Sequence, residues 1–199
     1  AINAVIEGQG ARTAVIATQG FRDILELRRG ARTHLLDPLM EKPPAFVPRR
    51  WRFEVPERTL WNGEVRQPLD EDALRNVLGY LRDEGIESVA VCLLHSYANQ
   101  DHERRVRDIV QAELPDVSVT LSSDVVPEIK EYERTSTAAL NAYIQPVVAK
   151  YLHRLENELQ DRGLNIGVQM MQSNGGVMTV DEAAERPIQI LESGPAAGT

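Results

Sequence analysis

The sequence predicts an α/β fold in which buried parallel strands alternate with helices. Apolar runs without charged residues lie at residues 13–18 and 88–94, and such runs are typical of strands that are buried on both faces of a sheet. Apolar residues also recur at helical spacing, over residues 70–84 and 127–162. Strands that alternate with helices in this way favour a parallel sheet.

The composition fits one globular domain, with or without a small appendage. The 199 residues are 42% hydrophobic and 26% charged, which provides enough apolar material for a sizeable core. The net charge of -8 opposes non-specific binding to nucleic acid and to anionic membranes. No apolar run approaches the roughly 18–20 residues that a membrane span requires.

The single cysteine, Cys92, excludes a disulfide framework and agrees with a reducing compartment, so we expect a cytoplasmic protein. Cys92 lies within an apolar run, where burial makes a thiol inert, and we therefore do not expect it to be a nucleophile.

The first 27 residues predict a helix, a strand and a second helix. Residues 13–18 are the strand, and Gly20 supplies the turn into a helix over residues 21–27. The chain lacks an initiator Met and opens in helical residues, and it stops at Thr199 just inside a Gly-rich helix start. We therefore expect both ends to be cut from a longer protein.

Residues 37–70 differ in character, because six prolines and both tryptophans lie there. Each proline removes a backbone donor and biases the residue before it toward extended geometry. This stretch therefore predicts an irregular excursion with short strands at residues 51–55 and 59–65, the second of them around an Asn62-Gly63 turn.

A regular alternation of helix and strand follows. Asp70 is the predicted N-cap of a helix that Gly85 ends, and the buried strand at residues 88–94 comes next. A second helix over about residues 101–113 and a strand at residues 117–121 complete this part.

The longest helical pattern runs from about residue 127 to residue 162. Pro146 lacks the N–H that would bond four residues back, so we expect a kink or a split there. Gly163 is the predicted stop, and residues 166–171 predict another buried strand with residues 173–176 at its carboxyl end. The apolar stripe of this helix contains Ala139, Leu140, Tyr143, Ile144, Val147, Val148, Tyr151, Leu152, Leu155 and Leu159.

The loop at residues 173–176 is the first candidate for binding chemistry. Its two glycines, Gly175 and Gly176, permit a positive φ and a close approach of the backbone, so that N–H groups can face an anion. An ordinary tight turn also explains this sequence.

Residues 193–198 are the second candidate. Gly194 followed by Pro195 is typical of a helix start, and the small residues after them allow the helix to pass close to another backbone. An ordinary capped helix is the competing interpretation.

Carboxylates, basic groups and hydroxyls crowd residues 127–137, among them Glu128, Glu131 and Arg134. The helix dipole favours acidic residues in a first turn, so capping alone explains several of them. His95 ends the apolar strand and His102 opens the next helix. Two histidines that flank one loop are candidate metal ligands. No further residue lies at a spacing typical of metal ligands, so we expect the two histidines to form hydrogen bonds and expect no metal site.

Five segments occur in an order that resembles one known family. They are GFRDILE at residues 20–26, CLLHSY at 92–97, EYERTST at 131–137, MQSNGG at 171–176 and SGPAAG at 193–198. Together they resemble the hydantoinase A/5-oxoprolinase family, which includes the A-type component of ATP-dependent N-methylhydantoinase and the β component of acetone carboxylase. The resemblance covers nearly the whole chain.

The resemblance implies an α/β fragment of an actin/Hsp70-like (ribonuclease H-like) ATPase domain. Such proteins hold ATP between two α/β domains with two phosphate loops of Asp-Gly-Gly-Thr type, and neither loop is in this sequence. The resemblance places residues 1–199 in a truncated N-terminal hydantoinase/oxoprolinase domain. Residues 37–70 are then its irregular excursion, and residues 188–199 begin a hinge-crossing helix toward the second domain.

The resemblance also implies an ATP-dependent cyclic amidohydrolase, in which ATP phosphorylates the oxygen of a hydantoin or 5-oxoproline amide before water attacks. ATP and Mg²⁺ would serve the longer protein and would not bind this fragment tightly, and a hydantoinase B-type subunit or domain would be the partner. It implies cofactor-binding roles for Ser173, Asn174, Gly175, Gly176, Gly194 and Pro195. Weaker catalytic candidates are His95, Glu128, Glu131 and Arg134.

Two alternatives stay open. One is an acetone carboxylase β-type ligase, which activates a ketone and bicarbonate. The other is a non-catalytic interaction module that docks a partner through residues 37–70, in which case deletion of these residues should abolish partner binding and leave the fold intact.

Overall fold

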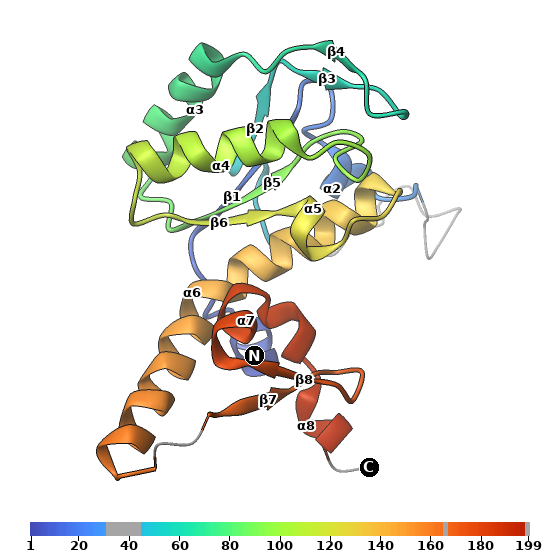
Figure 1. Cartoon of the computed structure of the whole chain (residues 1–199). Helices are drawn as coiled ribbons and strands as arrows, with labels where there is room; N and C mark the ends of the chain where they lie inside the picture. Colours follow the sequence, from blue (N-terminus) through green and yellow to red (C-terminus); the bar gives the residue numbers. More distant parts are fainter. Residues whose placement is uncertain (31–44, 165–166, 198–199) are drawn as a thin grey trace, which may run out of the picture.

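The computed structural model describes residues 1–30, 45–164 and 167–197. Its larger body is a parallel four-stranded sheet with helices on both faces, in the order β2-β1-β5-β6 (Figure 1). The predicted α/β fold with a parallel sheet is confirmed. The four strands are β1 (Thr13–Thr18), β2 (Arg52–Val55), β5 (Ser88–Cys92) and β6 (Ser118–Leu121).

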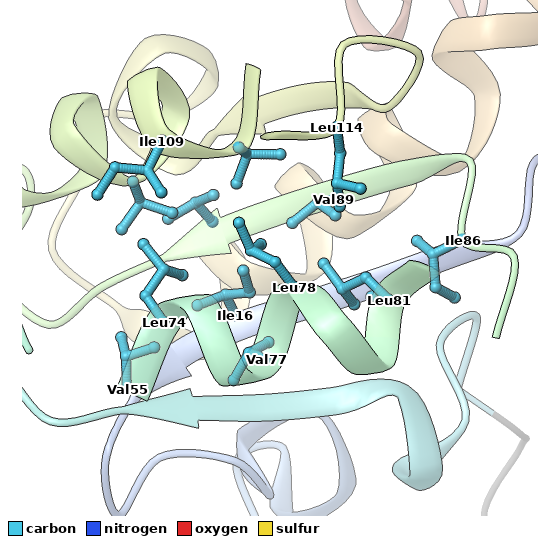
Figure 2. Close-up of a cluster of buried hydrophobic side chains, with 14 of the residues drawn as sticks. Ile16, Val55, Leu74, Val77, Leu78, Leu81, Ile86, Val89, Ile109 and Leu114 are labelled. Carbon is cyan, nitrogen blue, oxygen red and sulfur yellow. The ribbon is translucent and has the colours of Figure 1, made fainter. Parts of the chain in front are cut away.

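Successive residues of the central strands face opposite helical layers. Ile16 of β1 packs in a cluster with α3 (Glu71–Asp83) and α4 (Asp101–Glu113), as Figure 2 shows. Its neighbour Val15 packs in a second cluster with α2 (Ile24–Leu27) and α6 (Glu131–Asp161). Because both faces are covered, these strands read as continuous apolar runs without polar alternation.

Helix α3 begins and ends where the sequence predicts. The Asp70 carboxylate accepts a hydrogen bond from the Ala73 N–H at 2.9 Å, which caps the first turn. Gly85 adopts a φ of +61°, and the N–H of Ile86 bonds back to the carbonyl of Leu81 at 2.9 Å. A left-handed glycine with such a return bond is a common helix stop.

The predicted strand at residues 51–55 of the Pro-rich stretch is present as β2, and it joins the main sheet. Strand β2 pairs in parallel with β1, with Val15 beside Arg52. Strands β3 (Arg58–Thr59) and β4 (Val65–Gln67) then form the predicted antiparallel hairpin. Residues 37–44 of the predicted excursion lie outside the described residues. Deletion of residues 37–70 would remove an edge strand, so it would not leave the fold intact.

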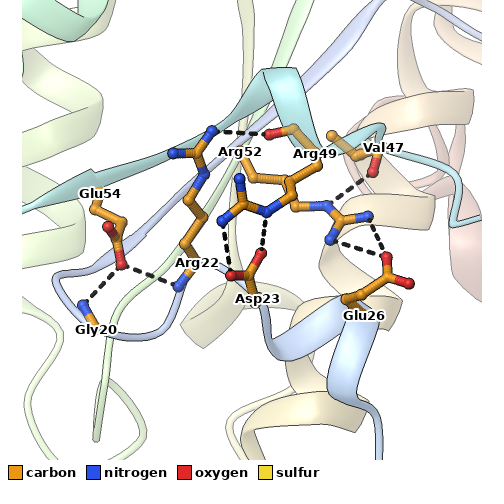
Figure 3. A network of polar contacts seen from close by, with 8 residues as sticks. All are labelled: Gly20, Arg22, Asp23, Glu26, Val47, Arg49, Arg52 and Glu54. Carbon is orange, nitrogen blue, oxygen red and sulfur yellow. Dashed lines mark hydrogen bonds and ion pairs between the residues drawn. The ribbon is translucent and has the colours of Figure 1, made fainter.

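A carboxylate on β2 fixes the turn that follows β1 (Figure 3). One oxygen of Glu54 accepts hydrogen bonds from the Gly20 N–H at 2.7 Å and from the Arg22 N–H at 3.2 Å. Gly20 has a φ of +93°, which is the left-handed conformation that glycine adopts most easily. The predicted turn at Gly20 is therefore confirmed.

Two arginine side chains join the same region to the start of α2. The Arg49 guanidinium donates two hydrogen bonds to the Asp23 carboxylate, at 2.8 and 3.0 Å, and this contact lowers the pKa of Asp23. Arg52 is buried, donates to the carbonyl of Val47 at 2.9 Å and lies 3.4 Å from the Glu26 carboxylate. Figure 3 shows that these contacts tie β2 to α2.

Helix α6 spans the larger body and a smaller C-terminal body. Its first part packs against β5 and β1, and its second part packs against α7 (Val180–Glu185) and η2 (Pro187–Ile190). Pro146 lies inside this continuous helix, which bends partway along and is not split (Figure 1). The helix begins directly after Lys130, whose φ is +89°, and so starts later than the predicted residue 127.

The second half of α6 buries only part of its apolar stripe. Ile144, Val148 and Leu152 are buried in the C-terminal body, whereas Val147 is 40% exposed and Tyr151 is 55% exposed. The apolar pattern of a helix does not show how wide the covered face is, and these two residues of the stripe lie outside it.

The C-terminal body is built on a two-stranded antiparallel sheet of β7 (Gln169–Met171) and β8 (Val177–Thr179). The prediction of a buried strand in an α/β sheet at residues 166–171 is therefore wrong for β7, although residues 165–166 lie outside the described part. Helix α7 follows with a capping box between Thr179 and Glu182, and α8 (Ser193–Ala197) follows η2. The hydrogen bonds from Thr179 lower the pKa of the Glu182 carboxyl.

The N-terminal helix α1 (Ile2–Ile6) leads into a close backbone contact with the middle of α6. The Ala11 N–H donates to the Tyr143 carbonyl at 2.8 Å. A Cβ atom on Gly10 would overlap the Tyr143 ring as the structure places it, so glycine suits the close approach at this position.

We expect Leu78→Ala to lower the free energy of unfolding by about 2–5 kcal/mol, because it opens a cavity in the cluster between α3 and the sheet. Asn76→Ala, at an exposed position of the same helix, should change it by less than about 0.5 kcal/mol. Urea unfolding followed by circular dichroism measures both values. Equal effects of the two substitutions would contradict the described packing of α3.

The Asp23–Arg49 pair predicts a specific pH dependence. The pKa of Asp23 is lower in the folded chain than in the unfolded one, so the pair stabilises the fold above about pH 4 and this contribution disappears as the pH falls through the folded pKa. Asp23→Asn should therefore lose less thermal stability than the unsubstituted chain between about pH 6 and pH 3. Arg49→Gln should behave in the same way, and a loss as large as that of the unsubstituted chain would refute the assignment.

Candidate functional site

The carboxyl edge of the parallel sheet carries a buried polar network. Ligands of α/β sheets usually bind at this edge, where the loops that follow the strands meet. Glu103 of α4 is fully buried and accepts hydrogen bonds from the Leu93 N–H at 2.9 Å, the Ser123 N–H at 2.9 Å and the Ser122 hydroxyl at 2.6 Å. These three donors compensate the burial of the carboxylate. One side chain thus ties the ends of β5 and β6 to α4.

A second buried carboxylate, Glu57, ties the loop after β2 to β1 and α4. It accepts a hydrogen bond from the Thr18 hydroxyl, and its other oxygen lies 2.8 Å from His102 Nδ1. Thr18 Oγ1 in turn accepts from the Leu94 N–H at 2.8 Å. His102 is therefore a hydrogen-bonding residue, as expected from the sequence.

The predicted catalytic candidates gather beside this network. Arg134 is buried and donates to the carbonyl of Leu93 at 2.7 Å and to that of Glu128 at 3.1 Å. Its Nε atom has no hydrogen-bond partner among the residues that the structure describes. The guanidinium lies 5.8 Å from the centre of the Tyr97 ring, which contacts the His95 ring edge-on.

These candidates differ in how accessible their polar groups are. Glu128 is exposed, and Glu131 is half-buried and lines a cavity of about 10 Å³ together with Arg134. A cavity of that size holds at most one water molecule. His95 Nδ1 lies 2.8 Å from a backbone carbonyl. Cys92 lines the same cavity, and burial raises the pKa of its thiol, which agrees with the expectation that it is inert.

The predicted cofactor-binding residues lie in the other body, at the hairpin turn between β7 and β8 (Figure 1). Gly175 has a φ of +87°, and its N–H donates to the Gln172 carbonyl at 3.0 Å. The Gly176 N–H donates to the Asn174 side-chain oxygen at 2.9 Å. Both glycine N–H groups are thus used inside the turn, which connects the two strands β7 and β8.

Ser173 brings this turn to the start of α8. Its hydroxyl donates to the Gln189 carbonyl at 2.9 Å and accepts from the Glu192 N–H at 3.1 Å. Gly194 and Pro195 follow directly in α8. The structure therefore brings the two predicted cofactor-binding segments together and keeps them apart from the catalytic candidates.

Sequence reasoning missed the two buried carboxylates. Glu103 carried a usable signal, because it lies at helical spacing with Val106 and Val110 on the buried stripe of α4. An acidic residue on an apolar stripe indicates a buried carboxylate that needs donors. Glu57 lies in a connection between strands, where no periodic pattern shows which side chains are buried.

Metal binding and membrane insertion find no support in the described residues. Across residues 1–30, 45–164 and 167–197, no three His, Cys, Asp or Glu side chains are grouped so that they could hold a metal ion. None of the helices in these ranges combines the length and the apolar character that crossing a membrane requires.

Comparison with known proteins gives two matches to family models. Residues 1–114 match the hydantoinase/oxoprolinase N-terminal region, and residues 134–199 match the hydantoinase/oxoprolinase model. Together these matches cover most of the chain.

Individual proteins resemble the chain over almost its full length. An uncharacterised protein of Methanocaldococcus jannaschii is 41% identical over 94% of the chain, which spans 28% of that protein. The crystal structure of the ATP-dependent caprolactamase from Pseudomonas jessenii superposes with a TM-score of 0.90 at 35% identity, over 98% of this chain and 29% of that one. The nucleotide-free structure of acetone carboxylase superposes with a TM-score of 0.87 at 31% identity, over 99% of this chain and 29% of that one.

The chain thus spans less than a third of the length of these relatives. Both matching models describe hydantoinase/oxoprolinase proteins. The chain belongs to the hydantoinase/oxoprolinase family.

Proposed function

We propose that this chain is part of an ATP-dependent enzyme that hydrolyses a cyclic amide. The observation that carries the proposal is the similarity to the ATP-dependent caprolactamase, whose structure superposes on 98% of this chain. The family match supports the same reaction class.

The chemistry explains why such an enzyme needs ATP. The carbonyl of an unstrained lactam is a poor electrophile, because its nitrogen donates electrons into it. In the proposed reaction the amide oxygen attacks the γ-phosphorus and ADP leaves. Water would then attack the activated carbon, and the C–N bond would break so that the ring opens and its nitrogen leaves as a protonated amine. A second water would hydrolyse the resulting acyl phosphate to a carboxylate and phosphate. Phosphoryl transfer of this kind depends on positioned phosphates and on electrostatic stabilisation.

We assign the nucleotide-facing role to the turn between β7 and β8 and to the start of α8. The supporting observation is that Ser173 holds the turn, with Asn174, Gly175 and Gly176, against the segment that leads to Gly194 and Pro195. The placement of residues 188–199 at an interdomain hinge and the actin-like domain arrangement stay predictions from the family resemblance.

We propose that Mg²⁺ accompanies ATP in the longer protein. Mg²⁺ is bound through carboxylates together with substrate phosphates, and no three acidic or histidine side chains of the described ranges converge.

The catalytic roles of His95, Glu128, Glu131 and Arg134 also stay a proposal. Among them, Glu128 and Glu131 offer the carboxylates that a ligand can approach, and Arg134 holds the start of α6 against β5. We propose that Arg134 positions this edge and that the two glutamates are the candidates for proton transfer.

A ligase function is the second candidate, because acetone carboxylase superposes almost as well as the caprolactamase. A partner protein suits both reactions, since one curated relative is the α subunit of caprolactamase from Pseudomonas jessenii. We propose a B-type subunit or domain as that partner.

The two reactions are separated by measuring ADP release from a full-length protein that contains this region, together with its partner. We expect ADP release that depends on caprolactam, hydantoin or 5-oxoproline. Gly175→Val should reduce this activity at least about tenfold, because valine resists the φ of +87° at the turn. Gly79→Ala, in helix α3 with open space around it, is the matched control and should leave the activity unchanged. ADP release that depends on acetone and bicarbonate, and not on any of the cyclic amides, would favour the ligase.

The 199-residue chain by itself should bind ATP weakly or not at all. The two Asp-Gly-Gly-Thr loops that the family resemblance assigns to the phosphates are not in its sequence. Isothermal titration calorimetry with ATP, in the presence and absence of Mg²⁺, measures this directly. Mg²⁺-dependent binding with a low-micromolar Kd would contradict the expectation.

A further inference from the structure

The hairpin of β3 and β4 presents large apolar side chains to solvent. Trp61 at its tip is 75% exposed, and Val65 on β4 is 42% exposed. The other tryptophan, Trp51, is half-buried and packs against the core cluster. Tryptophan is among the residues that contribute most to protein–protein binding when they become buried. An exposed tryptophan at the tip of a hairpin therefore needs an explanation.

The backbone of this hairpin is held firmly in place. The Asn99 side chain donates to the Gly63 carbonyl at 2.9 Å, and His95 Nδ1 lies 2.8 Å from the Thr59 carbonyl. The Leu60 N–H donates to the Glu64 carbonyl at 2.8 Å across the turn. A surface that is already rigid loses little conformational entropy when a partner binds.

Two arginines of the same hairpin lack an acidic partner within the described ranges. Arg58 and Arg66 line an open hollow of about 540 Å³ together with Leu60 and Gln67. Neither arginine forms an ion pair with any residue that the structure describes, and Arg58 donates to the carbonyl of Gln19 at 3.1 Å. The chain as a whole carries a net charge of -8, so this local positive surface stands against an acidic background.

We propose that the β3–β4 hairpin is a docking surface for an acidic segment of a partner protein. Carboxylates of the segment would bind the Arg58 and Arg66 guanidinium groups, and an adjacent apolar side chain would cover Trp61. Arginine binds carboxylates through paired hydrogen bonds, which gives the hollow its specificity. The proposal does not depend on the reaction proposed above. The interaction-module alternative placed the docking surface anywhere in residues 37–70, and the present proposal limits it to the β3–β4 hairpin. Strand β2 then keeps its place in the main sheet.

The test is a titration of the ¹⁵N-labelled chain with the peptide acetyl-Glu-Glu-Leu-Glu-Glu-amide, followed by NMR. We expect saturable shifts of the Trp61 indole N–H and of the backbone amides of Gly63, Val65 and Arg66. Arg66→Glu and Trp61→Ala should each weaken binding at least about tenfold, and Arg66→Gln should weaken it by an intermediate factor. Higher salt should weaken it further, because exposed charges are screened.

Matched controls keep the result specific. Arg154→Glu makes the same charge change at an exposed position on the second half of α6 and should leave the affinity unchanged. The peptide acetyl-Lys-Lys-Leu-Lys-Lys-amide should cause no hairpin shifts, and unchanged thermal midpoints show that the variants fold. Equal binding by Arg66→Glu would overturn the proposal. So would a concentration-dependent dimer that Trp61→Ala abolishes, because the occupant would then be a second copy of the chain.

Discussion

Burial of both faces of the parallel sheet is the constraint on which the rest of this structure depends. It requires a helical layer on each side, so α3 and α4 cover one face while α2 and α6 cover the other. It also removes water from the strand ends, so the polar groups there need partners within the chain. Glu103 and Glu57 meet that need by accepting from hydroxyl and backbone donors at the strand ends. The polar carboxyl edge is therefore a consequence of the apolar sheet.

The elements that sequence reasoning locates correctly are those governed by local rules. Asp70 and Gly85 bound α3 because capping and left-handed geometry act over a few residues. Strand β2 is expected from its local residues, but its parallel pairing with β1 is not, because that pairing depends on contacts between distant residues. Strand β7 is mistaken for a strand of a buried sheet for a related reason, since an apolar run shows that a strand exists and does not show which neighbour it has.

The candidate site shows the same division. The motifs point to His95, Glu128, Glu131 and Arg134 as chemistry-bearing residues, and the fold gathers them beside one sheet edge. The motifs do not reveal that Arg134 is buried against backbone carbonyls or that the glycine N–H groups of the β7–β8 turn are already bonded. Both facts depend on side-chain packing between elements that are distant in the sequence. The spacing of apolar and polar residues along one sequence does not predict such contacts.

Helix α6 gives this chain a mechanical property. Its 31 residues, at about 1.5 Å of rise each, form a rod about 46 Å long that holds Arg134 in its first turn beside the sheet edge and continues past the α7 helix of the other body. Pro146 cannot donate to the carbonyl of Ala142, so the rod has one weakened joint near the boundary between the two bodies. Helix α6 is therefore one continuous backbone connection between the C-terminal body and the sheet edge that holds Arg134, and Pro146 removes one of its internal hydrogen bonds.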